Sequence, residues 1–255
     1  VGTVEHSRAP SLVHTGAIYM HRGRNYRVTD LDLDTRRAVV EPDNSGRWTS
    51  ARSNVEISVT DMRQRRSLGR SHVHFGSVEV TTTVTGYQEF QNSGPKKDRR
   101  RGETVDLDFE PNSLHTTSVW WEWDPSVLEL GGVREFSIPG ALHAAEHAAI
   151  GMLPLFAICD RWDVGGVSIA QMPGTNLPTV FIYDGYPGGA GISDLAFERA
   201  EELLGATADL LESCGCTSGC PSCVQSPKCG NGNEPLDRWG ALGLLRATLG
   251  DADPF

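Results

Sequence analysis

A run of closely spaced cysteines constrains this chain more than any other feature. Five of its six cysteines lie in the sixteen residues CGCTSGCPSCVQSPKC, from Cys214 to Cys229. The first four form two close pairs, C-x-C and C-x-x-C, separated by three residues. Four thiolates suit a tetrahedral zinc ion, and the glycines and proline between them favour a tight knuckle. The predicted ligands are Cys214, Cys216, Cys220 and Cys223.

Other uses of these thiols compete with zinc. Disulfides would fit a secreted protein, but the chain shows no export signal, and its sixth cysteine, Cys159, lies in an apolar context. An iron–sulfur cluster and a redox dithiol are further alternatives. Cys229 could also replace Cys214 or Cys216 as a ligand. Because four cysteines would close the coordination sphere, the predicted zinc is structural rather than catalytic.

Length and composition indicate a globular protein with no membrane partner. The 255 residues contain no apolar run near the ~20 residues that span a bilayer, and the N-terminus does not read as a signal peptide. We therefore expect a cytoplasmic protein. The first residue is not Met, so we expect the sequence to be part of something longer.

Charge is distributed unevenly along the chain. Residues 1–135 carry 18 basic and 19 acidic residues, whereas residues 136–255 carry 5 basic and 14 acidic ones. The net charge of −10 therefore comes almost entirely from the second half. Any contact with a polyanion is expected in the first half.

The residue pattern predicts an α+β fold, which begins with a β-rich module over 1–135. Residues 12–66 are predicted to form strands and tight turns, and the nearly alternating apolar and polar residues over 16–42 predict a small antiparallel meander with a glycine turn in HRGRN. The β-branched stretch 72–90 predicts a further strand pair. SVWWEWD, 118–124, predicts another strand, with tryptophans on both of its faces.

The second part, residues 136–255, is predicted to be an α/β module closed by the zinc knuckle. Its first segment is rich in alanine and low in charge, which indicates a buried helix that Pro154 ends or kinks. Helices are expected over 140–158, 192–214 and 235–250, and a central strand over 179–184.

Three long segments resemble a known family. CGCTSGCPSCVQSPKCGNGNEPLDR, LHAAEHAAIGMLPLFAICDRWDVGGVS and PTVFIYDGYPGGAGISDLAFE are similar to the C-terminal region of MrfA-type DNA repair helicases, which is named the MZB domain for its zinc. The likeness is most specific over 138–240. HTGAIYMHRGRNYRVTDLDLDTRRAVVEP also resembles the β-rich segment that precedes this domain in those helicases.

The resemblance implies a role within a larger machine. The parent would be a superfamily-two helicase that uses ATP and Mg²⁺ to move 3′ to 5′ on single-stranded DNA during repair. Its two RecA-like motor domains would be this chain's partners and would precede it. The sequence contains no G-x-x-x-x-G-K-[ST] phosphate loop, so we expect no ATP hydrolysis by this chain alone and no catalytic residue.

Two features are candidate DNA contacts. Five positive charges fall within six residues, a density that suits a phosphate contact and also suits a solvated loop. Trp121 could stack on a base if its face of the strand is exposed, although a core position is the ordinary alternative. The predicted nucleic-acid-binding residues are Lys96, Lys97, Arg99, Arg100, Arg101 and Trp121.

A competing function rests on HAAEH, which places His143, Glu146 and His147 in the order of the inverted zinc-peptidase motif. On a helix the two histidines share a face and Glu146 could act as a base. A third ligand would be needed, and the candidates by position are Glu198, Glu201 and Glu202. The alternatives are therefore a zinc metallopeptidase and a structural scaffold with no DNA role.

The acids Asp160, Asp163 and Asp184 allow a further interpretation. Each lies near a predicted strand end and is followed by glycines, so the three could gather around Mg²⁺ as in nucleases. The same loops could also offer backbone N–H groups to a phosphate. Tight turns with acid–arginine pairing are the ordinary interpretation of the same pattern.

Overall fold

The computed structural model describes residues 1–92 and 99–250. The chain divides into two compact units, and each is discontinuous in sequence: Val1–Val55 with Thr81–Ser113, and Glu56–Val80 with Leu114–Phe255. Strands β4 (Arg47–Leu68) and β5 (Ser71–Asn92) contribute residues to both units. These compact units interleave along the chain, so their bounds differ in kind from the two consecutive modules expected over 1–135 and 136–255. Independent folding of those two modules stays a prediction.

The first unit contains the predicted meander. Strands β1 (Ile18–His21), β2 (Arg24–Asp32) and β3 (Arg37–Pro42) form an antiparallel three-stranded sheet. His21 pairs with Arg24, so the connecting turn consists of Arg22 and Gly23, both with positive φ. Two such residues are typical of a type I′ hairpin turn, whose twist matches that of the strands.

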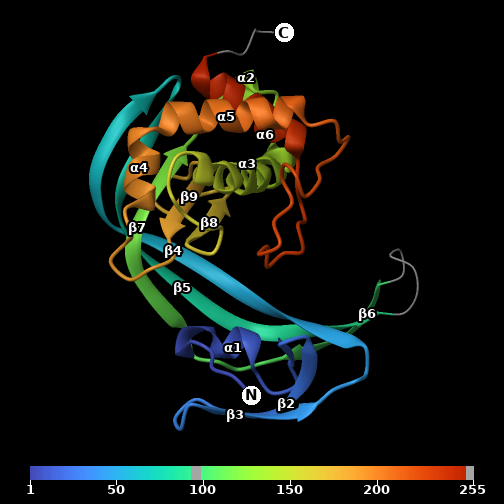
Figure 1. Cartoon of the computed structure of the whole chain (residues 1–255). Coiled ribbons are helices and arrows are strands. Elements are labelled where there is room, and N and C mark those ends of the chain that lie inside the picture. Colours follow the sequence, from blue (N-terminus) through green and yellow to red (C-terminus); the bar gives the residue numbers. More distant parts are fainter. Residues whose placement is uncertain (93–98, 251–255) are drawn as a thin grey trace. The chain divides into compact units, whose positions relative to one another are not determined.

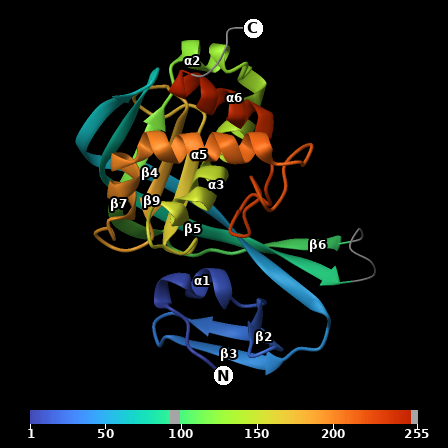
Figure 2. The same cartoon turned by 45° about the horizontal axis from the view of Figure 1, so that its top comes forward.

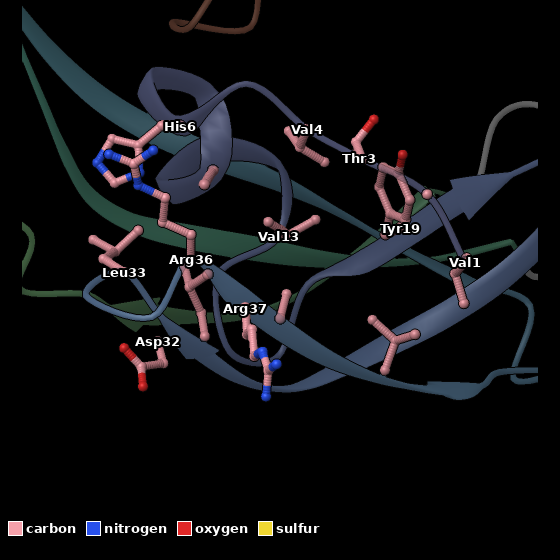
Figure 3. Close-up of a pocket in the computed structure, with 15 residues that line it drawn as sticks. Val1, Thr3, Val4, His6, Val13, Tyr19, Asp32, Leu33, Arg36 and Arg37 are labelled. Atoms are coloured by element: carbon pink, nitrogen blue, oxygen red, sulfur yellow. The ribbon is translucent and has the colours of Figure 1, made fainter.

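Short helical turns cover this sheet. Turn η1 (His6–Arg8) leads into α1 (Ala9–Leu12), whose Ala9 packs with Val13 and Val28 in a small core. Beside this core is a pocket of about 360 Å³ with Val4, Val13 and Tyr19 among its walls (Figure 3). None of the described residues that are predicted to bind metal or DNA lines this pocket.

The second hairpin differs from the prediction. The stretch 72–90 was expected to hold two strands, but it lies within the single strand β5, which is hydrogen-bonded to β4 and β7 (Asn112–Glu122) and also pairs with β6 (Arg99–Asp106). Its glycines do not form turns. A Cβ at Gly76 would lie 2.0 Å from the Asp61 carbonyl oxygen, and one at Gly86 would lie 2.6 Å from that of Val105. Both glycines therefore permit close approach of a neighbouring backbone.

In the second unit, a helical layer covers one part of a sheet. Strands β8 and β9 belong to this sheet, which has the order β4-β5-β7-β9-β8. Strand β6, whose residues belong to the first unit, pairs with β5. Helix α3 packs on β8 and β9, and α5 and α6 pack on α3 (Figures 1 and 2). The elements of this unit are β7 (Asn112–Glu122), α2 (Pro125–Leu130), η2 (Glu135–Ser137), α3 (Ile138–Met152), η3 (Leu153–Leu155), β8 (Val164–Ile169), β9 (Thr179–Asp184), α4 (Ile192–Glu198), α5 (Ala200–Ser213) and α6 (Arg238–Leu249).

These elements confirm most of the predicted α/β pattern, and their bounds have local causes. Strand β9 is central, as expected, and pairs antiparallel with β7 and β8. Helix α3 ends just before the Leu153–Leu155 turn because Pro154 lacks the N–H that would continue it. The single helix expected over 192–214 is divided at Arg199 into α4 and α5. Among the described residues, no helix is both long and apolar enough to cross a bilayer.

Trp120 and Trp121 of β7, with Trp123 just after its end, pack into the cores on both faces of the sheet. Trp120 packs with Phe181 and Val78 on one face, whereas Trp121 and Trp123 belong to the larger core under the helices. Both Trp121 and Trp123 are only 1% exposed. The expected stacking of Trp121 on a DNA base is therefore corrected to a core role, because its ring has no free face in this structure.

Gly166 on β8 lets α3 lie close to the sheet. A Cβ at this position would lie 2.5 Å from Oε1 of Glu146 and 2.7 Å from its Cγ, and Glu146 is buried. We predict that Gly166→Ala lowers the free energy of unfolding by about 1–3 kcal/mol through overpacking, measured by urea denaturation.

Gly205→Ala on α5 is the matched control, because no atom lies within 4 Å of a Cβ there. Alanine should stabilise that helix by about 0.5–1 kcal/mol. Equal stability of the Gly166→Ala variant and the parent would contradict close packing of α3 on β8.

Candidate metal centre

The four cysteines of the two close pairs converge at the end of α5. The Sγ–Sγ distances are 3.6 Å for Cys214–Cys216, Cys214–Cys220 and Cys216–Cys223, and 3.7 Å for Cys220–Cys223. Zinc with Zn–S bonds of about 2.3 Å in a tetrahedron requires sulfurs about 3.8 Å apart. The separations are too long for disulfide bonds, and all six cysteines are free thiols. The donor set and its spacing fit zinc.

The backbone around the cluster is shaped to present sulfur. Gly219 has a φ of 111°, a left-handed conformation that suits glycine. The N–H groups of Cys223, Val224 and Gln225 all donate to the carbonyl of Cys220, which closes the knuckle. The Cys220 N–H also donates to Sγ of Cys223 at 3.3 Å. Such N–H···S contacts stabilise thiolates, the form in which cysteine binds metal.

The thiols of the knuckle differ in acidity. Hydrogen bonding from the Ser222 N–H lowers the pKa of Cys220 to about 7. Burial raises the pKa of Cys223 to about 12. A bound cation opposes the second effect, because it stabilises the deprotonated form of every sulfur that it contacts.

A buried arginine that the sequence analysis did not single out organises the knuckle. Arg238, 2% exposed, donates from its guanidinium to the carbonyls of Leu211 at 2.8 Å and Cys214 at 2.6 Å, and also to that of Cys216. The same group lies 3.6 Å from Sγ of Cys216. Its charge offsets part of the negative charge of a four-thiolate zinc site.

Arg238 occupies a fixed position at the start of α6. The preceding residue, Asp237, caps this helix by accepting the Gly240 N–H at 2.9 Å. The signal for Arg238 was present in the sequence, since it is one of only five basic residues after residue 135 and lies next to a helix cap.

Cys229 lies outside the four-sulfur cluster. Its Sγ is 3.4 Å from Nε2 of His143, and together with His147 these groups form a second set of ligand atoms within 4.8 Å of one another. Cys229 was considered as a replacement for Cys214 or Cys216, and the structure places its thiol outside their cluster.

The peptidase alternative is not supported by the surroundings of its motif. His143 and His147 share a face of α3, as the i, i+4 spacing requires, but the third group beside them is the Cys229 thiol. Glu146 packs against Gly166 of β8, and burial raises its pKa to about 7. Of the candidate third ligands, Glu202 pairs with Arg199 and Glu201 with Arg66.

Asp160 and Asp163 stabilise a turn, and Asp184 ends strand β9. Asp184 is completely buried and accepts the N–H groups of Ala190, Ile192 and Ser193 at 2.5–3.2 Å, so the N-terminus of α4 already has its anion. Asp163 accepts the Asp160 N–H at 2.7 Å and the hydroxyl of Tyr186. Among the described residues, these acids do not gather into a metal-binding group.

The basic candidates for DNA contact lie in the β5–β6 hairpin. Lys96 and Lys97 fall outside the described residues. Arg99, Arg100 and Arg101 begin β6, where their backbones pair with residues 90–92 of β5. The structure places these three arginines at one end of a hairpin in the first unit.

Comparisons with known proteins identify relatives of both units. The model of the MrfA Zn-binding domain matches residues 145–224. The ATP-dependent helicase YprA of Bacillus subtilis, itself uncharacterised, is 31% identical over 88% of this chain and 29% of its own length. The uncharacterised protein MJ1572.1 of Methanocaldococcus jannaschii is 40% identical over 42% of this chain and 99% of its own length.

A solved structure resembles almost the whole chain. The crystal structure of the DUF1998 helicase MrfA bound to DNA is 27% identical, with a TM-score of 0.65, and covers 95% of this chain and 31% of that protein. This chain thus spans less than a third of the length of the two helicases. The matched zinc-binding domain includes all four cysteines of the knuckle and excludes Cys229 and His143.

Removal of the buried guanidinium should unfold the knuckle. We predict that Arg238→Met lowers the free energy of unfolding by about 3 kcal/mol or more, because buried carbonyls lose their donor and the thiolates lose a counter-charge. Urea denaturation measures this loss. Arg238→Lys, which keeps the charge but not the planar fork, should fall between this variant and the parent. Unchanged stability of Arg238→Met would contradict the role of Arg238.

Proposed function

Because the chain belongs to the family of proteins that carry the MrfA Zn-binding domain, we propose that it acts as the accessory C-terminal region of an ATP-dependent DNA repair helicase. The observation that carries this proposal is the likeness of 95% of the chain to a DNA-bound helicase, joined to a four-sulfur cluster of zinc geometry. In the proposal, ATP and Mg²⁺ belong to the RecA-like motor domains of the parent protein.

The proposed zinc is structural. Its ligands are Cys214, Cys216, Cys220 and Cys223, and a closed four-thiolate site leaves no position for a reacting water. When bound, zinc holds the four thiolates at one point and fixes the segment between α5 and α6. Arg238 extends this restraint from the knuckle to α6, since it contacts Leu211, Cys214 and Cys216.

Loss of one knuckle ligand should remove this zinc. We predict that Cys220→Ser loses one zinc equivalent and melts at least several degrees lower, because metal-binding energy is also folding energy. Elemental analysis and thermal denaturation by circular dichroism measure the two effects.

Cys159→Ser is the control, since Cys159 lies in neither group of ligand atoms. It should keep the zinc content of the parent. A Cys220→Ser protein with undiminished zinc would contradict the assignment of these ligands.

The proposed role toward DNA is to hold or guide a single strand as the motor moves 3′ to 5′. The β5–β6 hairpin supports it, because Arg99, Arg100 and Arg101 follow one another at the hairpin end, next to Lys96 and Lys97 in sequence. Phosphate contacts of this kind bind any sequence, which suits a translocating enzyme. The scaffold alternative predicts no such binding.

DNA binding should depend on these arginines and on salt. We predict that replacing Arg99, Arg100 and Arg101 with alanine weakens binding of a fluorescent single-stranded oligonucleotide and reduces the salt dependence. The magnitude of the slope of log K against log salt should decrease by about 2, because each lost phosphate contact on a single strand contributes about 0.7. Fluorescence anisotropy across a salt series measures both quantities.

A charge-matched control replaces Arg134, Arg199 and Arg246, which lie in the second unit. It should keep the slope of the parent. Equal losses in the two triple variants would indicate a general charge effect and contradict the hairpin contact. Absence of salt-dependent binding by both this chain and the full-length parent would favour the scaffold alternative.

A further inference from the structure

We propose that His143, His147 and Cys229 form a second metal site, a His₂Cys site for zinc that is separate from the four-cysteine knuckle. The ligand atoms of the three residues all lie within 4.8 Å of one another. Both histidines are buried, at 8% and 5% exposure. The proposal does not depend on the role toward DNA, and the four knuckle cysteines are not part of it.

The hydrogen bonds of the two imidazoles fix which nitrogen faces the site. Nδ1 of His143 lies 2.8 Å from the Pro235 carbonyl oxygen, and Nδ1 of His147 lies 2.7 Å from that of Val224. A carbonyl only accepts, so each Nδ1 carries a hydrogen. In the neutral imidazole, Nε2 is then a lone-pair donor. Such Nδ1–H···O=C bonds orient the histidine ligands of metal sites in many proteins.

The third group does not satisfy both nitrogens by itself. Cys229 Sγ accepts the Asn233 N–H at 3.2 Å and lies 3.4 Å from Nε2 of His143. A thiol has one hydrogen, whereas two neutral imidazoles present two lone pairs. Without a cation, the single thiol hydrogen can reach only one of the two Nε2 lone pairs at a time, unless an imidazole is charged. A single zinc ion satisfies all three groups at once.

The chemistry of the donors selects the metal. Two imidazoles and one thiolate suit zinc, and they do not suit Ca²⁺ or Mg²⁺, which prefer oxygen. Three protein ligands leave a fourth tetrahedral position for water or another ligand, unlike the closed knuckle. No carboxylate belongs to this ligand group among the described residues, so the set differs from the His₂Glu site of the peptidase alternative.

The site would join distant segments. His143 and His147 belong to α3, and Cys229 lies in the loop between the knuckle and α6. This loop is also attached through Lys228, whose Nζ donates to the carbonyls of Arg161 and Val164. The Val224 carbonyl that holds His147 follows Cys223 directly, so the segment 223–224 serves both sites.

Metal stoichiometry tests the proposal. The whole chain is reduced, given excess ZnCl₂, passed through a desalting column and measured by elemental analysis. We expect two zinc equivalents per chain for the parent and one for Cys229→Ser or His147→Gln. Cys159→Ser and His115→Gln are matched controls, since neither residue belongs to a ligand group and His115 is exposed. Both controls should keep two equivalents.

A second measurement needs no variant and therefore does not depend on variant folding. Zinc-edge X-ray absorption of the parent should give an average of about 2.5 sulfur and about one imidazole nitrogen neighbours per zinc. One zinc equivalent with four sulfur neighbours in the folded parent would overturn the proposal. So would a second equivalent that survives in the folded Cys229→Ser protein.

Discussion

The convergence of four thiols on one point is the constraint on which the C-terminal half of the second unit depends. Between α5 and α6 the chain runs for 24 residues, 214–237, without a helix or strand. Such a segment has little apolar surface to bury and a large conformational entropy to lose. Sulfur–metal bonds and the hydrogen bonds of Arg238 offset that entropy at the start of the segment, and the contacts of Cys229 and Lys228 restrain its later part.

This arrangement explains why a polar, charged group lies in the core. Arg238 is among the largest fully buried side chains, and an isolated buried guanidinium would be strongly unfavourable. It is stable here because the C-terminal carbonyl of α5 and the first carbonyls of the knuckle accept its N–H groups. The arginine satisfies helix-end acceptors and thiolates together, so the helical layer and the metal centre form one structure.

Much of this could be predicted from the sequence where the signal is local. The hairpin turn at Arg22 and Gly23, the central strand β9 and the end of α3 near Pro154 follow from turn chemistry, a short apolar run and a missing N–H. The spacing of the cysteines led to the four thiols that the structure brings together. The resemblance to MrfA-type helicases rested on long segments, and the comparisons confirm it.

The remainder depends on contacts between residues distant in sequence. Nothing in the sequence near Gly76 and Gly86 indicates that neighbouring backbones occupy the space beside them, and the single long strand over 72–90 was not predicted. His143 and Cys229 are far apart along the chain, and their meeting requires the loop after the knuckle to return to α3. Trp121 resembled a stacking residue because periodicity does not say which strand faces are covered.

A metal held by the knuckle sulfurs should maintain the structure between α5 and α6. Hydrogen exchange by mass spectrometry, with and without a strong zinc chelator, tests it most directly. Chelation should greatly increase amide exchange in the C-terminal turn of α5, the knuckle and the first turn of α6, while the β1–β2–β3 meander keeps its protection. Unchanged protection of the knuckle in chelator-treated protein shown to be free of zinc would contradict the account.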